Sequence, residues 1–216
     1  ANLTPSNLRC DYAANPLGVD SSNPRLFWKL GGSGRGEKQT AYQILAATSE
    51  KELNENRGSL WDSGKVDSDE SIQIPYNGEK LISSEEVFWK VRVWDANGKV
   101  SPWSRTATWT MGILDPKDWQ AKWIGAADTN IASLLLRHDF AVKPHLKRAL
   151  DCVCGLGEYE LSLNDKKVGN DFLSPGWTAS PPPSLSDTFD ITANLRHGRN
   201  AMGIELGHGM YNVLGW

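Results

Sequence analysis

The stretch "VFWKVRVWD", Val87 to Asp95, constrains the fold more than any other part of the chain, because its side chains alternate with a period of two. One face of an extended strand would carry Trp89, Val91 and Val93, and the other would carry Lys90, Arg92 and Trp94. Such alternation is typical of a half-buried strand and does not fit a helix. No stretch before Trp119 shows a long helical period, so the first half of the chain is predicted to consist of strands.

Shorter runs of the same kind, each bounded by turn residues, predict the other strands of this half. They lie at Leu3 to Cys10, Leu26 to Leu30, Thr40 to Thr48 and Thr106 to Met111. Two shorter runs complete the set: one in which Trp61 and Val66 flank a turn at Ser63-Gly64, and a short strand that follows it. About seven short strands in roughly 110 residues are the signature of an immunoglobulin-like or fibronectin type III sandwich. The segment "SEKELNEN" predicts one helical turn, with Ser49 as N-cap and Glu52 three residues later.

The segment "ILDPKDW", Ile113 to Trp119, interrupts this pattern and is predicted to be a domain boundary. Strands are predicted beyond it at Leu134 to Phe140, Arg148 to Cys154, Tyr159 to Leu163, Phe189 to Ile191 and Ala201 to Leu206. We therefore predict an all-β chain with two domains. Residues 1–114 form a fibronectin type III or immunoglobulin-like sandwich, and residues 119–216 form a second β-sandwich. The last residues, "ELGHGMYNVLGW", read as a strand entering a glycine-rich turn, so the second sandwich is predicted to be truncated.

The composition excludes two classes of partner. The formal net charge is −3, the pI is near 5.8, and no basic stripe offsets the acidic residues, which argues against nucleic-acid binding. No apolar run approaches the ~18 residues that span a bilayer, so no membrane span is expected. The three cysteines are interpreted as small core residues and do not identify a cellular compartment.

No set of residues predicts an active site. Glycoside hydrolysis needs two carboxylates across a cleft, but the available pairs lie side by side or in polar turns. These pairs are Glu158 with Glu160, Asp67 with Asp69, and Glu85 with Glu86. The four histidines are scattered, and no spacing of histidine or cysteine predicts a zinc site. Asp165, Asn170 and Asp171 are oxygen donors near turns that would suit calcium, but such groups are common in loops and do not predict a site. We therefore predict no catalytic residue, no metal and no cofactor.

Six of the ten tryptophans fall into three groups. Trp28, Trp89 and Trp109 are predicted to be core residues, and Trp94 and Trp103 could form an exposed stack with the guanidinium of Arg92. Trp177 follows a Pro-Gly turn in "LSPGWT", where its ring could stack on a sugar or pack against a neighbouring domain. Trp177 and Tyr211 are the candidate residues for carbohydrate binding or interdomain contact.

Four strings of the chain resemble, in the right order, the N-terminal region of bacterial α-L-rhamnosidases. They are "LRCDYAANPLGVDSSNPRLFWKL", "LWDSGKVDSDESIQIPYNGEKLISSEEVFWKVRVWDANGKVSPWS", "DWQAKWIG" and "GLGEYELSLNDKKVGNDFLSPGWT". This resemblance implies a fibronectin-like sandwich and a second β-sandwich, followed by an (α/α)6 barrel that holds both catalytic glutamates and the rhamnose pocket. The barrel's Arg-Asp-Glu-Arg-like motif has no counterpart here.

The resemblance predicts a non-catalytic accessory portion of a secreted or periplasmic α-L-rhamnosidase, an inverting glycoside hydrolase that releases terminal L-rhamnose from glycans. Its partner would be the missing C-terminal catalytic barrel, and rhamnose-containing glycans would be bound through that barrel. The alternative is a free-standing carbohydrate-binding or adhesion module that uses Trp177 and Tyr211. An enzyme with its own active site is a third reading. On the first reading, strands missing from the second sandwich would leave an open edge that promotes association.

Overall fold

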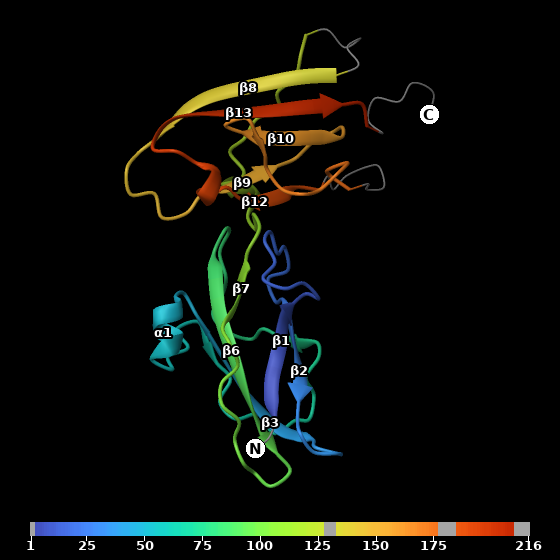
Figure 1. Cartoon of the computed structure of the whole chain (residues 1–216), viewed down its shortest axis with the longest axis vertical. Helices are drawn as coiled ribbons and strands as arrows, with labels where there is room; N and C mark the ends of the chain where they lie inside the picture. Colours follow the sequence, from blue (N-terminus) through green and yellow to red (C-terminus); the bar gives the residue numbers. More distant parts are fainter. Residues whose placement is uncertain (1–2, 128–132, 177–184, 210–216) are drawn as a thin grey trace. The chain divides into compact units, whose positions relative to one another are not determined.

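The structure is a computed structural model, and it describes residues 3–127, 133–176 and 185–209. The chain divides into two compact units, Ala1–Gln120 and Ala121–Trp216, and each is described by itself. Apart from one short α-helix and two 3-10 turns, the regular structure in the described ranges is β (Figure 1). In the same ranges, no helix is long and apolar enough to cross a membrane.

The first unit is the predicted sandwich of two antiparallel sheets. Its strands are β1 (Thr4–Cys10), β2 (Arg25–Gly31), β3 (Gln39–Ala47), β4 (Trp61–Asp62), β5 (Ile74–Pro75), β6 (Glu86–Asp95) and β7 (Ala107–Thr110). One sheet has the order β1-β2-β5 and the other has the order β4-β3-β6-β7. A 3-10 turn, η1 (Pro116–Asp118), follows β7.

Strand β6 is buried on the face that its alternation predicts. Val87, Trp89, Val91 and Val93 are all 0% exposed. Trp109 on β7 packs edge-on against Trp89, with 6.3 Å between the ring centroids. The indole of Trp28 is also buried, and its Nε1 donates to Gln39 Oε1 at 3.0 Å. The three tryptophans predicted to be core residues are therefore confirmed, and they explain why two small sheets can bury a large apolar area.

The short helix α1 (Glu50–Asn54) follows β3, as the capping pattern predicts. The side chain of Ser49 accepts a hydrogen bond from the backbone N–H of Glu52 at 3.4 Å. Leu53 anchors the helix, since it is fully buried in a small cluster with Leu45 and Ala47. One turn of helix is not stable alone, so it depends on tertiary contacts such as this one with β3.

The described part of the second unit has two antiparallel sheets. Its strands are β8 (Ser133–Val142), β9 (Leu150–Val153), β10 (Tyr159–Leu163), β11 (Lys166–Lys167), β12 (Asp187–Asp190) and β13 (Gly198–Gly207), with the 3-10 turn η2 (Thr192–Asn194) between the last two. One sheet has the order β11-β10-β13-β8, and the other pairs β12 with β9. Figure 1 shows β8 as the outermost strand beside β13.

The core of the second unit is centred on β10. Tyr159, Leu161 and Leu163 are buried, as their alternation predicts, and they pack with half-buried side chains from β8, β9, β12 and β13. The hairpin turn between β10 and β11 is also confirmed. Asn164 and Asp165 have positive φ angles of 53° and 65°, which Asn and Asp tolerate best among residues with a side chain.

Candidate functional site

The two residues predicted to bind carbohydrate or a neighbouring domain, Trp177 and Tyr211, lie outside the described residues. The loop that leads to Trp177 is described, and it presents large apolar side chains to solvent. Phe172 is 84% exposed and Leu173 is 68% exposed. The ammonium of Lys167 lies 4.3 Å from the centroid of the Phe172 ring. This loop is therefore an exposed apolar and cationic surface, a combination that can contact either a protein or a sugar.

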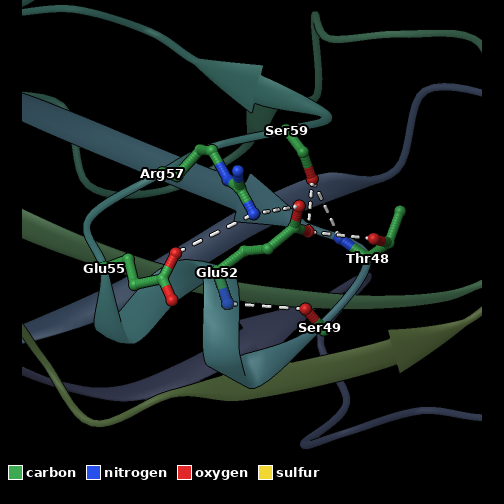
Figure 2. Close-up of polar contacts among 6 residues, drawn as sticks. All are labelled: Thr48, Ser49, Glu52, Glu55, Arg57 and Ser59. Carbon is green, nitrogen blue, oxygen red and sulfur yellow. Dashed lines mark hydrogen bonds and ion pairs between the residues drawn. The ribbon is translucent and has the colours of Figure 1, made fainter.

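Glu52 of the first unit is held by several polar contacts (Figure 2). Its Oε2 accepts hydrogen bonds from the hydroxyls of Ser59 at 2.7 Å and Thr48 at 2.9 Å. Its Oε1 lies 2.9 Å from Nη2 of Arg57. The hydrogen bonds from Ser59 and Thr48 lower the pKa of the Glu52 carboxyl, and Arg57 adds to this effect. Glu52 therefore stays ionised and ties α1 to the following loop, a structural role rather than acid–base catalysis.

The acidic pairs considered from the sequence do not form a catalytic arrangement. Each has at least one carboxylate engaged locally: Glu160 with Lys167 at 2.8 Å, Asp67 with Lys65 at 3.2 Å, and Glu85 with the backbone N–H of Ile82 at 2.9 Å. Each of these contacts holds the carboxylate against neighbouring residues of its own strand or turn. A glycosidase instead needs two carboxylates that face each other across the substrate.

A polar cluster inside the second unit was not predicted from the sequence. The hydroxyl of Tyr159 donates to Oδ2 of Asp187 at 2.6 Å. Asp151 lies close enough for its charge to act on Tyr159, and its Oδ2 is buried without a hydrogen-bond partner among the described residues. Burial raises the pKa of the Asp151 carboxyl. Burial, together with the hydrogen bond to Asp187, also raises the pKa of the Tyr159 phenol well above its usual range.

The register of the β9–β12 pair explains how these carboxylates come together. Asp151 is opposite Phe189 and Asp187 is opposite Val153, so both carboxylates lie on the face whose apolar members join the core. One sequence signal could have predicted the burial of Asp151. It lies two residues before the apolar Val153, so on a strand the two side chains share the inward face. Because both carboxylates stand on one face of one ribbon against a buried phenol, the cluster reads as an interior polar contact.

The stack predicted around Arg92 is present, although its members are half-buried rather than exposed. The guanidinium carbon lies 5.2 Å from the ring centroid of Trp94 and 4.6 Å from that of Trp103. Gln43 Oε1 accepts from Nε at 2.9 Å and from Nη2 at 2.7 Å. These contacts of the guanidinium join residues of the first unit, and the stack braces one face of the β3–β6 sheet.

Ligands for a metal ion are not gathered anywhere in the described ranges. No group of three or more His, Cys, Asp and Glu side chains there could hold a metal ion. Cys10, Cys152 and Cys154 form no disulfide in these ranges. Burial raises the pKa of the Cys10 thiol far above its usual range, which makes it an inert core residue.

Comparison with family models gives matches in both units. Residues 5–115 match the family described as the Rha78A-like, N-terminal immunoglobulin domain. Residues 145–215 match the family described as the alpha-L-rhamnosidase N-terminal domain. The two matches together cover most of the chain.

Curated proteins and solved structures give the same result. An alpha-L-rhamnosidase of Alteromonas sp. is 36% identical over 98% of this chain and 24% of its own length. One from Formosa agariphila is 34% identical over 92% of this chain and 23% of its own length. The structure of the alpha-L-rhamnosidase from Dictyoglumus thermophilum aligns with a TM-score of 0.90 and 37% identity, over 96% of this chain and 25% of that chain.

The chain thus spans about a quarter of the length of the relatives it matches. The matches involve both units, in the order in which the resemblance predicts them. The chain therefore belongs to the α-L-rhamnosidase family, of which it is an N-terminal, immunoglobulin-like and β-sandwich region.

Proposed function

We propose that this chain is an accessory portion of a bacterial enzyme that hydrolyses terminal L-rhamnose from glycans, and that the chemistry belongs to a separate (α/α)6 barrel. The observation that carries the proposal is that both units match N-terminal rhamnosidase domains, in order, over most of the chain. The engaged or interior carboxylates of the described ranges support it, because an inverting glycosidase needs a free acid and a free base.

The proposal is tested with the chain alone and a chromogenic α-L-rhamnoside. We expect no turnover above a heat-killed control. Turnover that persists after contaminating enzyme has been excluded contradicts the proposal. The gene is also read beyond the codon for Trp216, where we expect an open frame with long amphipathic helical periods and paired glutamates.

The role proposed for the two sandwiches is to brace the barrel and to shape the rim of its cleft. If the open frame is found, the barrel is expressed with and without residues 1–216. We expect the shortened protein to have a lower Tm and a raised KM for large glycans. Equal Tm and KM values for the two proteins would contradict the bracing role.

The proposal also includes a cellular location and the absence of direct L-rhamnose binding by this chain. We place the enzyme in the periplasm or outside the cell, where rhamnose-containing glycans are available, and cell fractionation with antibody detection tests this. Titration of the chain with L-rhamnose is expected to give no heat of binding. Saturable binding that disappears in Trp177→Ala would instead support a free-standing carbohydrate-binding module.

A further inference from the structure

Among the residues that the structure describes, strand β8 forms one edge of the second unit's larger sheet. It pairs with β13 over ten positions, from Ser133 opposite Gly207 to Val142 opposite Gly198, without any shift of register. In the part of the chain that the structure describes, no strand pairs with the other side of β8. That side therefore presents a regular row of backbone N–H and C=O groups.

The edge lacks most features that protect edge strands from pairing. Short length, proline, bulges, charged side chains and a covering helix or loop are the usual protections. Of these, β8 carries the charged pair Arg137 and Asp139. Strand β8 is ten residues long with the sequence SLLLRHDFAV, contains no proline and has no bulge against β13. Leu135 on its outer face is 76% exposed. The edge is thus suited to accept another strand, and its sequence indicates which strand fits.

The charges of β8 are arranged symmetrically about His138. Arg137 precedes it, Asp139 follows it, and the two form an ion pair at 3.0 Å on the outer face. Their side chains are 69% and 68% exposed, so both remain available to a second partner. A strand with this order of charges is complementary to its own antiparallel copy.

We propose that two copies of this chain associate through their β8 edges, antiparallel, with the two-fold axis passing at His138. Arg137 of each copy then stands opposite Asp139 of the other, which gives two attractive cross-strand pairs. Moving the axis to residue 137 would place arginine opposite arginine, and moving it to residue 139 would place aspartate opposite aspartate. Like charges directly opposite each other are destabilising, so charge disfavours both of these neighbouring positions of the axis, whereas the register centred on His138 gains two attractive pairs.

The same register also matches the apolar side chains. On the outer face it brings Leu135 opposite Ala141. On the inner face it brings Leu136 opposite Phe140, and Leu134 opposite Val142. The two four-stranded sheets would become one continuous sheet, in which the β8 edge of each copy is covered by β8 of the other. This association is proposed for the chain of residues 1–216 and rests on the edge that β8 forms there.

The test uses charge reversal on the full 216-residue chain, followed by sedimentation equilibrium. The unmodified chain is expected to dimerise. Asp139→Arg and Arg137→Asp are each expected to weaken the dimer at least about tenfold, because each places like charges opposite each other twice. Glu160→Arg makes the same charge change on β10, away from this edge, and should leave the dimer constant unchanged.

Rescue identifies the register. An equimolar mixture of Asp139→Arg and Arg137→Asp restores opposite charges at both positions, so it should form a heterodimer as tightly as the unmodified chain. The double variant R137D/D139R should regain the homodimer. Circular dichroism spectra that match the unmodified chain confirm folding of each variant.

Three outcomes would overturn the proposal. One is a monomer at all accessible concentrations. Slow hydrogen exchange of the backbone amides on both sides of β8 in such a monomer would show that another segment of the chain covers the edge. Another is a dimer that neither single variant weakens. The last is single variants that weaken the dimer without any rescue in the mixture or in the double variant.

Discussion

The hydroxyl of Tyr159 on β10 donates a 2.6 Å hydrogen bond to the carboxylate of Asp187 on β12. These strands belong to different sheets, so the bond joins the two sheets of the second unit across its core. Tyr159 is only 7% exposed, and water cannot easily replace its partner. The bond therefore couples the four-stranded sheet to the shorter β9–β12 ribbon.

Replacing Tyr159 with phenylalanine is expected to destabilise the second unit by about 1–2 kcal/mol, because Asp187 loses a buried donor. The free energy of unfolding in urea gives the loss. Tyr12→Phe is the matched control, since the Tyr12 ring is exposed and its hydroxyl only accepts from Gln73. Equal losses in the two variants would contradict an important role for the inter-sheet bond.

Removing the charge of Asp151 is expected to stabilise the protein at neutral pH. Burial raises the pKa of this carboxyl, so the folded chain holds the proton more tightly than the unfolded chain. The contribution of Asp151 to the free energy of unfolding is fully present below about pH 4, where the carboxyl is protonated in both states. It is lost as the pH rises through the folded pKa. Asp151→Val should therefore be more stable relative to the unmodified chain at pH 7 than at pH 4.

Asp190 on the same ribbon provides the control of opposite sign. Burial alone would raise the pKa of its carboxyl, but hydrogen bonds from Thr192 and Arg148 outweigh this and lower it. Asp190→Asn should destabilise the protein at pH 7, with an effect that shrinks as the pH falls through the lowered pKa. Urea unfolding curves at several pH values compare the two variants. A pH-independent effect of Asp151→Val would refute the burial argument.

Arg92→Lys is expected to destabilise the first unit by about 1–2 kcal/mol. Lysine cannot donate to Gln43 through two nitrogens, and its ammonium cannot lie flat against Trp94 and Trp103 together. Tryptophan fluorescence during urea unfolding measures the change. Arg105→Lys, at an exposed position, should stay within about 0.5 kcal/mol of the unmodified chain. A neutral Arg92→Lys would mean that charge alone holds the stack.

Glu52→Gln is expected to lower the stability of the first unit in a pH-dependent way. The folded state lowers the pKa of Glu52, so its contribution is present above the unfolded pKa of about 4.3 and is lost as the pH falls through the folded value. The difference in Tm from the unmodified chain should be largest at pH 7 and should shrink on acidification. Glu50→Gln, on the exposed side of α1, should show little change at either pH.

Several elements of the fold could be predicted from local patterns. Alternation identified β6 and β10, a capping pair identified α1, and Asn164-Asp165 identified a hairpin turn. Each of these signals acts between residues that are close in the chain, so it can be recognised without knowing the pairing of strands. The predicted ends of strands differ from the observed ones by a few residues, as for Arg148 to Cys154 against β9 (Leu150–Val153), because neighbouring strands decide where a ladder stops.

The candidate sites were less predictable. The stack at Arg92 could be predicted because Arg92 and Trp94 are two residues apart on one strand and therefore share a face. The Tyr159, Asp187 and Asp151 cluster was missed because its members come from β10, β12 and β9, which are brought together by the packing of two sheets. The structure describes neither Trp177 nor Tyr211, so their proposed roles stay predictions.

The sequence by itself determined the class of this protein: an all-β chain whose first unit is an immunoglobulin-like sandwich, with family membership carried by strings that extend over both units. Side-chain periodicity and turn residues are local properties, and they survive in the unfolded chain. Tertiary structure alone decided which carboxylates are solvated and which are buried, and that β8 stands at an edge with Arg137 and Asp139 exposed. Burial and strand order depend on contacts between distant residues, and no local pattern encodes them.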